Sequence, residues 1–73
     1  MTLRYTVVVE HGNDGWGVHV PDLPGCVAAG ETREEALDLI REAIRLHIDG
    51  LREEGLPVPP PNSESEVIEV GAA

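Results

Sequence analysis

The stretch VPDLPGC, Val20–Cys26, decides how this chain turns between its extended segments. Pro21 has no amide hydrogen to give to a neighbouring strand, so a strand that reaches this residue has to end there. The last four residues of the stretch, Leu23 to Cys26, have proline second and glycine third, which is the pattern of a type II turn. We therefore expect a rigid structural corner with four main residues: Pro21, Asp22, Pro24 and Gly25.

Two segments before this corner alternate between apolar and polar residues, as half-buried strands do. The first is LRYTVVVE at 3–10, and the second is WGVHV at 16–20. Between them, HGNDG supplies the glycines and the Asn/Asp pair that tolerate positive φ in a hairpin connection. The pattern predicts a β-hairpin, and a third short strand is expected after the corner at 26–29.

After this third segment the spacing of apolar residues changes from every second residue to every third or fourth. This spacing predicts one long helix at 33–54. Thr32 and Glu35 form a capping box, in which the hydroxyl accepts from an amide of the first turn and the carboxylate returns to the Thr32 amide. Gly55 suits the C-terminal cap, and Pro57 cannot continue a helix. One apolar stripe should pack on the sheet: Leu37, Ile40, Ile44, Ile48 and Leu51.

Leu39, Ala43 and Leu46 widen this apolar stripe on one flank of the helix. The flank is wider than one small sheet face requires, so these residues, together with Asp22, are candidates for contact with another chain. The alternative is that the C-terminal arm of the same chain covers the flank.

The residues after the helix begin as an extended arm, because the prolines at 57–61 exclude a helix. The short β-branched segment VIEV at 67–70 is expected to be a last strand. The element order is therefore β-β-β-α-β in a single α+β domain over residues 1–73, with one helix on one face of an antiparallel sheet.

The composition limits what such a chain can do. A domain of 73 residues has a marginal core, so a homodimer or a higher oligomer is expected. Its formal charge is -9, which disfavours direct nucleic-acid binding and suits a basic protein partner. No signal segment and no apolar run long enough for a membrane helix is found, so we expect a cytoplasmic protein without membrane contact.

The residue types that carry catalysis or bind metals stand apart in this sequence. His11, His19, His47 and Cys26 lack the close pairs that zinc sites show. Nothing near Cys26 would lower its pKa, and the acidic residues of the helix face solvent by their periodicity. We therefore expect no enzyme activity, no metal and no cofactor. A degenerate nuclease is the remaining catalytic alternative.

The segment GWGVHVPDLPGCVAAGETREEALDLIREAI, Gly15–Ile44, resembles the signature of HicB-like antitoxins in the order and spacing of its motifs. The resemblance implies a fold likened to part of ribonuclease H, in agreement with the element order above. It also implies a binding protein that neutralises HicA, a small basic toxin that cleaves messenger RNA with a histidine. An antitoxin of this kind would cover the RNA-binding and catalytic surface of the toxin.

Many HicB-like proteins carry a C-terminal DNA-binding segment. This sequence has only three residues after VIEV, so no such segment is expected. A stand-alone HicB-like adaptor or regulator that forms oligomers without a toxin is the alternative function.

Overall fold

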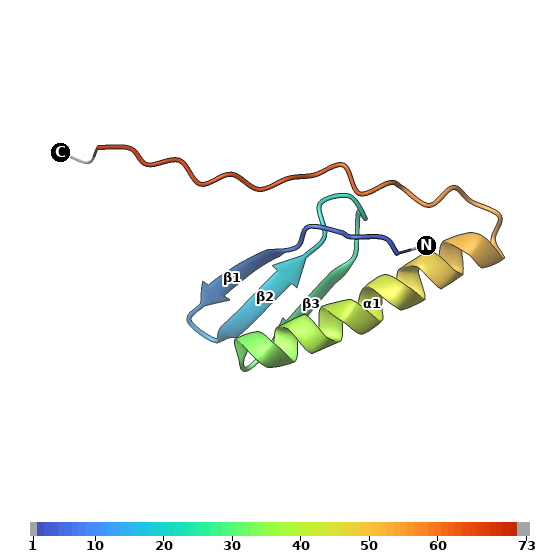
Figure 1. Cartoon of the computed structure of the whole chain (residues 1–73). Coiled ribbons are helices and arrows are strands. Elements are labelled where there is room, and N and C mark those ends of the chain that lie inside the picture. Colours follow the sequence, from blue (N-terminus) through green and yellow to red (C-terminus); the bar gives the residue numbers. More distant parts are fainter. Residues whose placement is uncertain (1, 72–73) are drawn as a thin grey trace.

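The computed structural model describes residues 2–71 and has a three-stranded antiparallel sheet with one helix on one face (Figure 1). The elements follow one another as β1 (Val8–Gly12), β2 (Gly15–His19), β3 (Val27–Gly30) and α1 (Arg33–Glu53). The strand order is β1-β2-β3, so each strand pairs with its neighbour in the sequence. This arrangement confirms the α+β class and the helix on one sheet face.

The strands are shifted from the expected ranges by the corner that follows β2. Val8 pairs with His19, the last residue of β2, so residues 3–7 have no partner in the β ladder and the first strand starts later than expected. The ladder instead runs to the tight turn, where Gly12 pairs with Gly15. Cys26 gives its amide to the corner, and β3 therefore covers 27–30 rather than 26–29.

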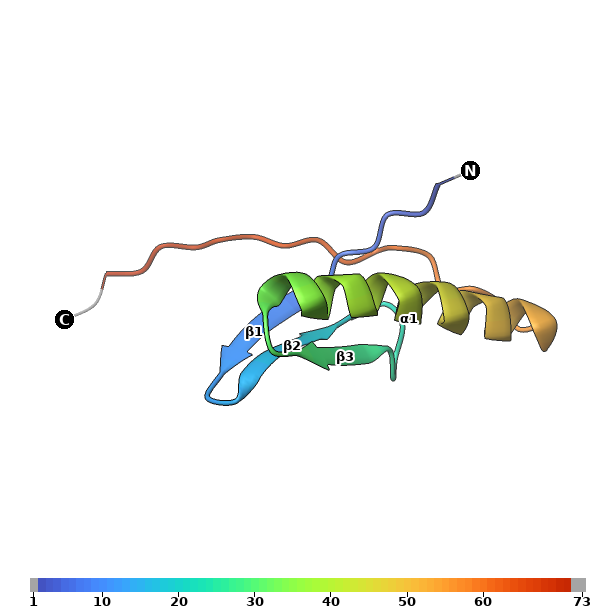
Figure 2. The same ribbon diagram turned by 90° about the horizontal axis from the view of Figure 1, so that it is seen from below.

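The core is small and lies between the sheet, the corner and the first half of α1. Its buried side chains come from all three parts: Val18, Val20, Leu23, Cys26, Ala36 and Ile40. Within the predicted helix stripe, Ile40 is buried, and Leu37 and Ile44 pack against the core. The helix lies chiefly over β3 and β2, and Figure 2 shows it along one face of the sheet.

Both ends of α1 are closed by local hydrogen bonds. At the N-terminus, the Thr32 hydroxyl accepts from the Glu35 amide at 3.0 Å, while the Glu35 carboxylate accepts from the Glu31 amide at 3.2 Å. The carboxylate thus reaches one residue further back than the expected Thr32 amide. At the C-terminus, Gly55 has φ 70° and the Leu56 amide donates to the Leu51 carbonyl at 2.8 Å, which makes a Schellman motif.

The described residues after α1, as far as Gly71, form a long extended arm without a strand. The arm turns back from the end of the helix, passes the corner, and then leaves the body of the molecule in both views (Figures 1 and 2). The expected last strand at 67–70 does not belong to the sheet formed by residues 2–71. Its side chains are exposed, because the arm contacts the body only as far as Ser63.

Candidate protein-interaction site

The corner between β2 and β3 is a network of backbone hydrogen bonds around one buried side chain. The Cys26 amide donates to the Leu23 carbonyl at 3.0 Å, and Gly25 has φ 85°, which together give the geometry of a type II turn. The Val20 amide donates to the Cys26 carbonyl at 3.1 Å and closes the loop. Leu23 is fully buried, whereas Pro21, Pro24 and Gly25 are exposed at the surface.

Asp22, the acidic residue of the corner, holds the C-terminal arm. One carboxylate oxygen accepts from the Ser63 amide and the other from the Ser63 hydroxyl, both at 2.8 Å. These bonds, first the one from the amide and then the one from the hydroxyl, keep the pKa of Asp22 below its ordinary value, because they favour the charged form. Asp22 therefore fixes the course of its own chain.

Two residues of the N-terminal segment also hold the arm. The Tyr5 hydroxyl donates to the Pro59 carbonyl at 2.6 Å, and the Thr6 hydroxyl donates to the Ser63 carbonyl at 2.8 Å. Neither residue was expected from the sequence to have this role, and no sequence pattern marks Ser63 as their partner. The arm is thus fastened over the N-terminal segment and the corner, while the expected flank of α1 stays partly uncovered.

The flank of α1 that was predicted to meet another chain is divided between core and surface. Ala43 is half-buried and packs against the core. Leu39 and Leu46, two helical turns apart, remain 43% and 63% exposed. Isolated exposed leucines are normal, but two on one helix flank form an apolar strip at which a partner can bind.

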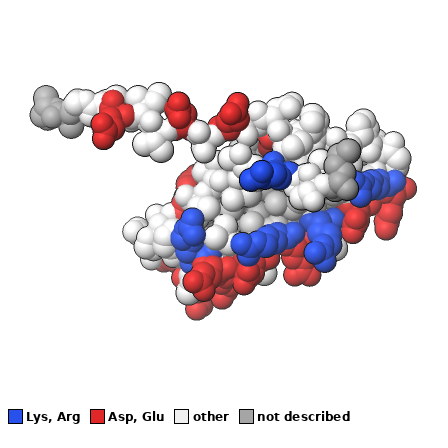
Figure 3. Space-filling model, viewed as in Figure 1, with Lys and Arg blue, Asp and Glu red and all other residues white. Residues whose placement is uncertain are grey.

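Charged side chains surround this strip. Figure 3 shows a row of arginines along α1 with acidic side chains beside it, and further acidic side chains on the arm. Four of the five basic residues lie on α1, and one ion pair joins Arg41 to Asp38 at 2.7 Å. The arm beyond the helix has three glutamates and no basic residue, so it is uniformly acidic: Glu64, Glu66 and Glu69.

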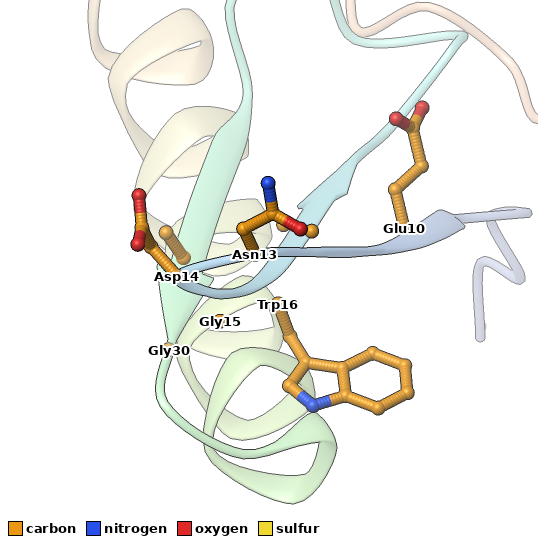
Figure 4. A pocket seen from close by; sticks show the side chains of 9 residues that line it. Glu10, Asn13, Asp14, Gly15, Trp16 and Gly30 are labelled. Atoms are coloured by element: carbon orange, nitrogen blue, oxygen red, sulfur yellow. The ribbon is translucent and has the colours of Figure 1, made fainter.

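In the shallow hollow at the end of the β1–β2 hairpin, the polar side chains do not point toward a common point. Glu10, Asp14 and Trp16 line it, and Figure 4 shows their side chains pointing in different directions. The ring of Trp16 stacks on His11, with centroids 4.1 Å apart. Within residues 2–71 no group of three or more His, Cys, Asp or Glu side chains is placed to hold a metal ion.

The other candidate residues for chemistry lie apart from one another. Cys26 is buried in the core, and this burial raises the pKa of its thiol. His19 lies on β2 between Val8 and Val27 of the neighbouring strands, and His47 lies on α1. In the part of the chain that the structure describes, no helix is long and apolar enough to cross a membrane.

The family model of the HicB-like antitoxins of bacterial toxin–antitoxin systems matches residues 5–71. This chain belongs to that HicB-like family. Antitoxin HicB 2 of Photorhabdus laumondii is 38% identical over 72 residues, and the match covers 97% of this chain and 52% of that protein. A UPF0150 protein of Thermoplasma acidophilum is 43% identical over 63 residues, which are 85% of this chain and 91% of its relative.

A solved structure has the same HicB-like fold. A chain of the HicA3 and HicB3 toxin–antitoxin complex superposes with a TM-score of 0.69 at 33% identity, over 81% of this chain and 70% of the other. A 14.9 kDa protein of Haemophilus phage HP1 is 42% identical over 66 residues, which are 90% of this chain. The present HicB-like chain spans about half the length of the phage protein and of the Photorhabdus antitoxin.

Proposed function

We propose that this chain is an antitoxin that binds a basic HicA-type ribonuclease toxin and covers its RNA-binding and catalytic surface. The observation that carries the proposal is the family match over residues 5–71, together with the shared fold of a chain in the HicA3–HicB3 complex. Inhibition by coverage needs binding rather than bond-breaking chemistry, so the proposed protein is not an enzyme. Its proposed place is the cytoplasm, where messenger RNA is translated.

The charge of the chain supports a basic partner. A net charge of -9 raises the rate of encounter with a cationic protein, and this effect weakens as salt screens the charges. A surface that binds RNA is cationic because it neutralises phosphates, so an acidic protein can compete for it. Electrostatic attraction therefore accounts for fast association, whereas tight binding needs buried contacts as well.

The exposed strip of α1 is our proposed source of those buried contacts. Leu39 and Leu46 provide an apolar centre, and Asp38, Glu42 and Arg45 provide a polar rim. A few central apolar side chains inside a polar rim carry most of the binding energy in protein interfaces. Asp22, by contrast, is engaged by Ser63 and is not part of the proposed toxin contact.

An RNA-cleavage assay tests the proposal. A purified HicA-type toxin is titrated with this chain, and cleavage of messenger RNA should fall to the background at equimolar antitoxin. Leu46→Asp should raise the inhibition constant at least about tenfold, since it places a charge in the apolar centre, and tenfold is about 1.4 kcal/mol. Val27→Asp is the matched control, because Val27 on β3 is 65% exposed, almost as much as Leu46 at 63%.

The outcomes separate the parts of the proposal. Undiminished cleavage in the presence of excess antitoxin at low salt would refute toxin inhibition. Inhibition that is lost with Val27→Asp but kept with Leu46→Asp would move the contact from α1 to the open face of the sheet. Slower association at higher salt is expected in either case, because the charge acts over a distance.

Self-association is part of the proposed state of the protein. Among residues 2–71 six apolar side chains are buried, and a domain of this size gains stability by binding a second chain. A homodimer, or a higher oligomer built from it, is therefore the proposed form that meets the toxin.

A further inference from the structure

The end of the arm has the composition of a strand and an extended course, but no strand lies beside it among residues 2–71. Residues 64–71 are all exposed, and Val67, Ile68 and Val70 keep 92%, 76% and 80% of their surface in contact with solvent. β-branched residues favour strands because their side chains pack well on a sheet. No backbone hydrogen bond joins residues 64–71 to any other part of the described chain. We call residues 67–70 the tail segment.

The anchors of the arm determine where the tail segment leaves the molecule. Ser63 is held by the Asp22 carboxylate and by the Thr6 hydroxyl. Thr6 lies two residues before β1, so the arm departs beside the beginning of this strand. Glu64 to Glu66 then provide three residues of extended chain, about 10 Å, before the tail segment begins.

The sheet offers an unpaired edge at the same place. β1 pairs with β2 on one side only, so its outward-facing N–H and C=O groups have no strand partner. The helix packs mainly on β3 and β2, which leaves β1 as the less covered edge. An open edge of this kind is a template for another strand. The lengths also fit, since β1 has five residues and the tail segment four.

Pairing of the tail segment with β1 of its own chain fits poorly. The Thr6–Ser63 bond sets the alignment of the two segments, and continuing it would place Val67 beside Glu10 and Val70 beyond the end of β1 at Gly12. Residues 64–66 would then lie beside residues 7–9, so polar residues would occupy the first part of the edge. Both views instead show the arm moving away from β1 after it passes the corner (Figures 1 and 2).

We propose that the tail segment adds as a fourth strand to the β1 edge of a second copy of this chain, with the two copies exchanging tails reciprocally. A two-fold axis makes the exchange symmetric, so each copy gives one strand and receives one. Arg4, the only Lys or Arg outside α1, lies four residues before β1, so a glutamate of an incoming tail that reaches the start of this edge meets a basic residue there. Glu10 disfavours registers that set Glu69 directly opposite it.

Molar mass in solution is the first test, and it uses the chain alone, without toxin. The parent chain should have twice its monomer mass of 7.9 kDa by light scattering. The triple variant Val67→Ser, Ile68→Ser, Val70→Ser should have the monomer mass with unchanged helical circular dichroism. Leu46→Ser is the matched control, a single exposed leucine on α1, and should remain dimeric.

Hydrogen exchange then identifies the edge. In the parent, amides of β1 should exchange more slowly than in the triple variant, while amides of β3 should be unchanged. A monomeric parent, or a triple variant that stays dimeric, would overturn the exchange of tails. Slow exchange that moves to β3 would overturn the choice of β1. No toxin is present in these measurements, so a negative result would refute the exchange of tails without bearing on toxin inhibition. A negative RNA-cleavage assay would likewise refute toxin inhibition without bearing on the exchange of tails.

Discussion

Replacement of Leu23 by alanine should remove a large part of the stability of this domain. Leu23 is 0% exposed and sits in the corner, where its amide donates to the Val20 carbonyl at 3.1 Å and its carbonyl accepts from Cys26. Leu→Ala changes in buried sites cost about 2–5 kcal/mol, and the cost is higher where the site cannot close around the cavity. Because both hydrogen bonds hold the backbone of Leu23 in place, we expect about 3–5 kcal/mol.

A domain of 73 residues has a total stability of roughly 4–11 kcal/mol, from about 0.05–0.15 kcal/mol per residue. Leu23→Ala should therefore lower the melting temperature by more than about 12 °C, at about 4–8 °C per kcal/mol. Urea unfolding followed by Trp16 fluorescence and circular dichroism, at one fixed protein concentration, measures the loss. Leu46→Ala, at a leucine that is 63% exposed, is the control and should cost less than about 1 kcal/mol. Equal losses in the two variants would refute the assignment of Leu23 to the core.

Three further changes probe the cap, the arm and the buried thiol. Thr32→Ala should cost about 1 kcal/mol in urea unfolding, because the Glu35 amide loses its acceptor, and Thr32→Ser should restore most of it. Acid should release the arm: the folded-state pKa of Asp22 is lowered, so its bonds to Ser63 stabilise the arm above about pH 4 and are lost as the pH falls further. Protection of the Ser63 amide from hydrogen exchange should fall as the arm is released. In Asp22→Asn this protection should no longer change with pH. Cys26, whose thiol pKa is raised by burial, should react with a thiol reagent much more slowly in the folded chain than in urea.

The sequence predicts the parts of this fold that depend on local pattern. The hairpin, the type II corner and the capped helix each have turn or cap residues at fixed spacing, and all three form where these residues stand. The strand limits were wrong by a few residues at 3–7, because apolar alternation continues past the point where a partner strand exists. Alternation shows which residues can form a strand, whereas pairing also needs a neighbouring strand that extends beside them.

The candidate contacts could be predicted only in part. The helix period places Leu39 and Leu46 outside the core, and both are exposed. The period cannot show that Ala43 packs inward, because this depends on how far α1 is rotated on the sheet. The bonds between Asp22 and Ser63 were missed entirely, since they join residues 41 positions apart and neither residue belongs to a local pattern with the other.

The corner links the core of the domain to its proposed exchange of tails. Leu23 fixes the corner from inside through burial, and Asp22, the residue before it, fixes the arm from outside through Ser63. Any change that loosens the corner should therefore release the arm and also widen the directions in which the tail segment can leave. A tail that is held up to Ser63 loses less conformational freedom on pairing with a second copy than a free one would. For this reason Asp22→Asn should raise the dissociation constant of the dimer, although Asp22 lies outside the proposed strand pairing. An unchanged dissociation constant would show that the corner does not contribute to self-association.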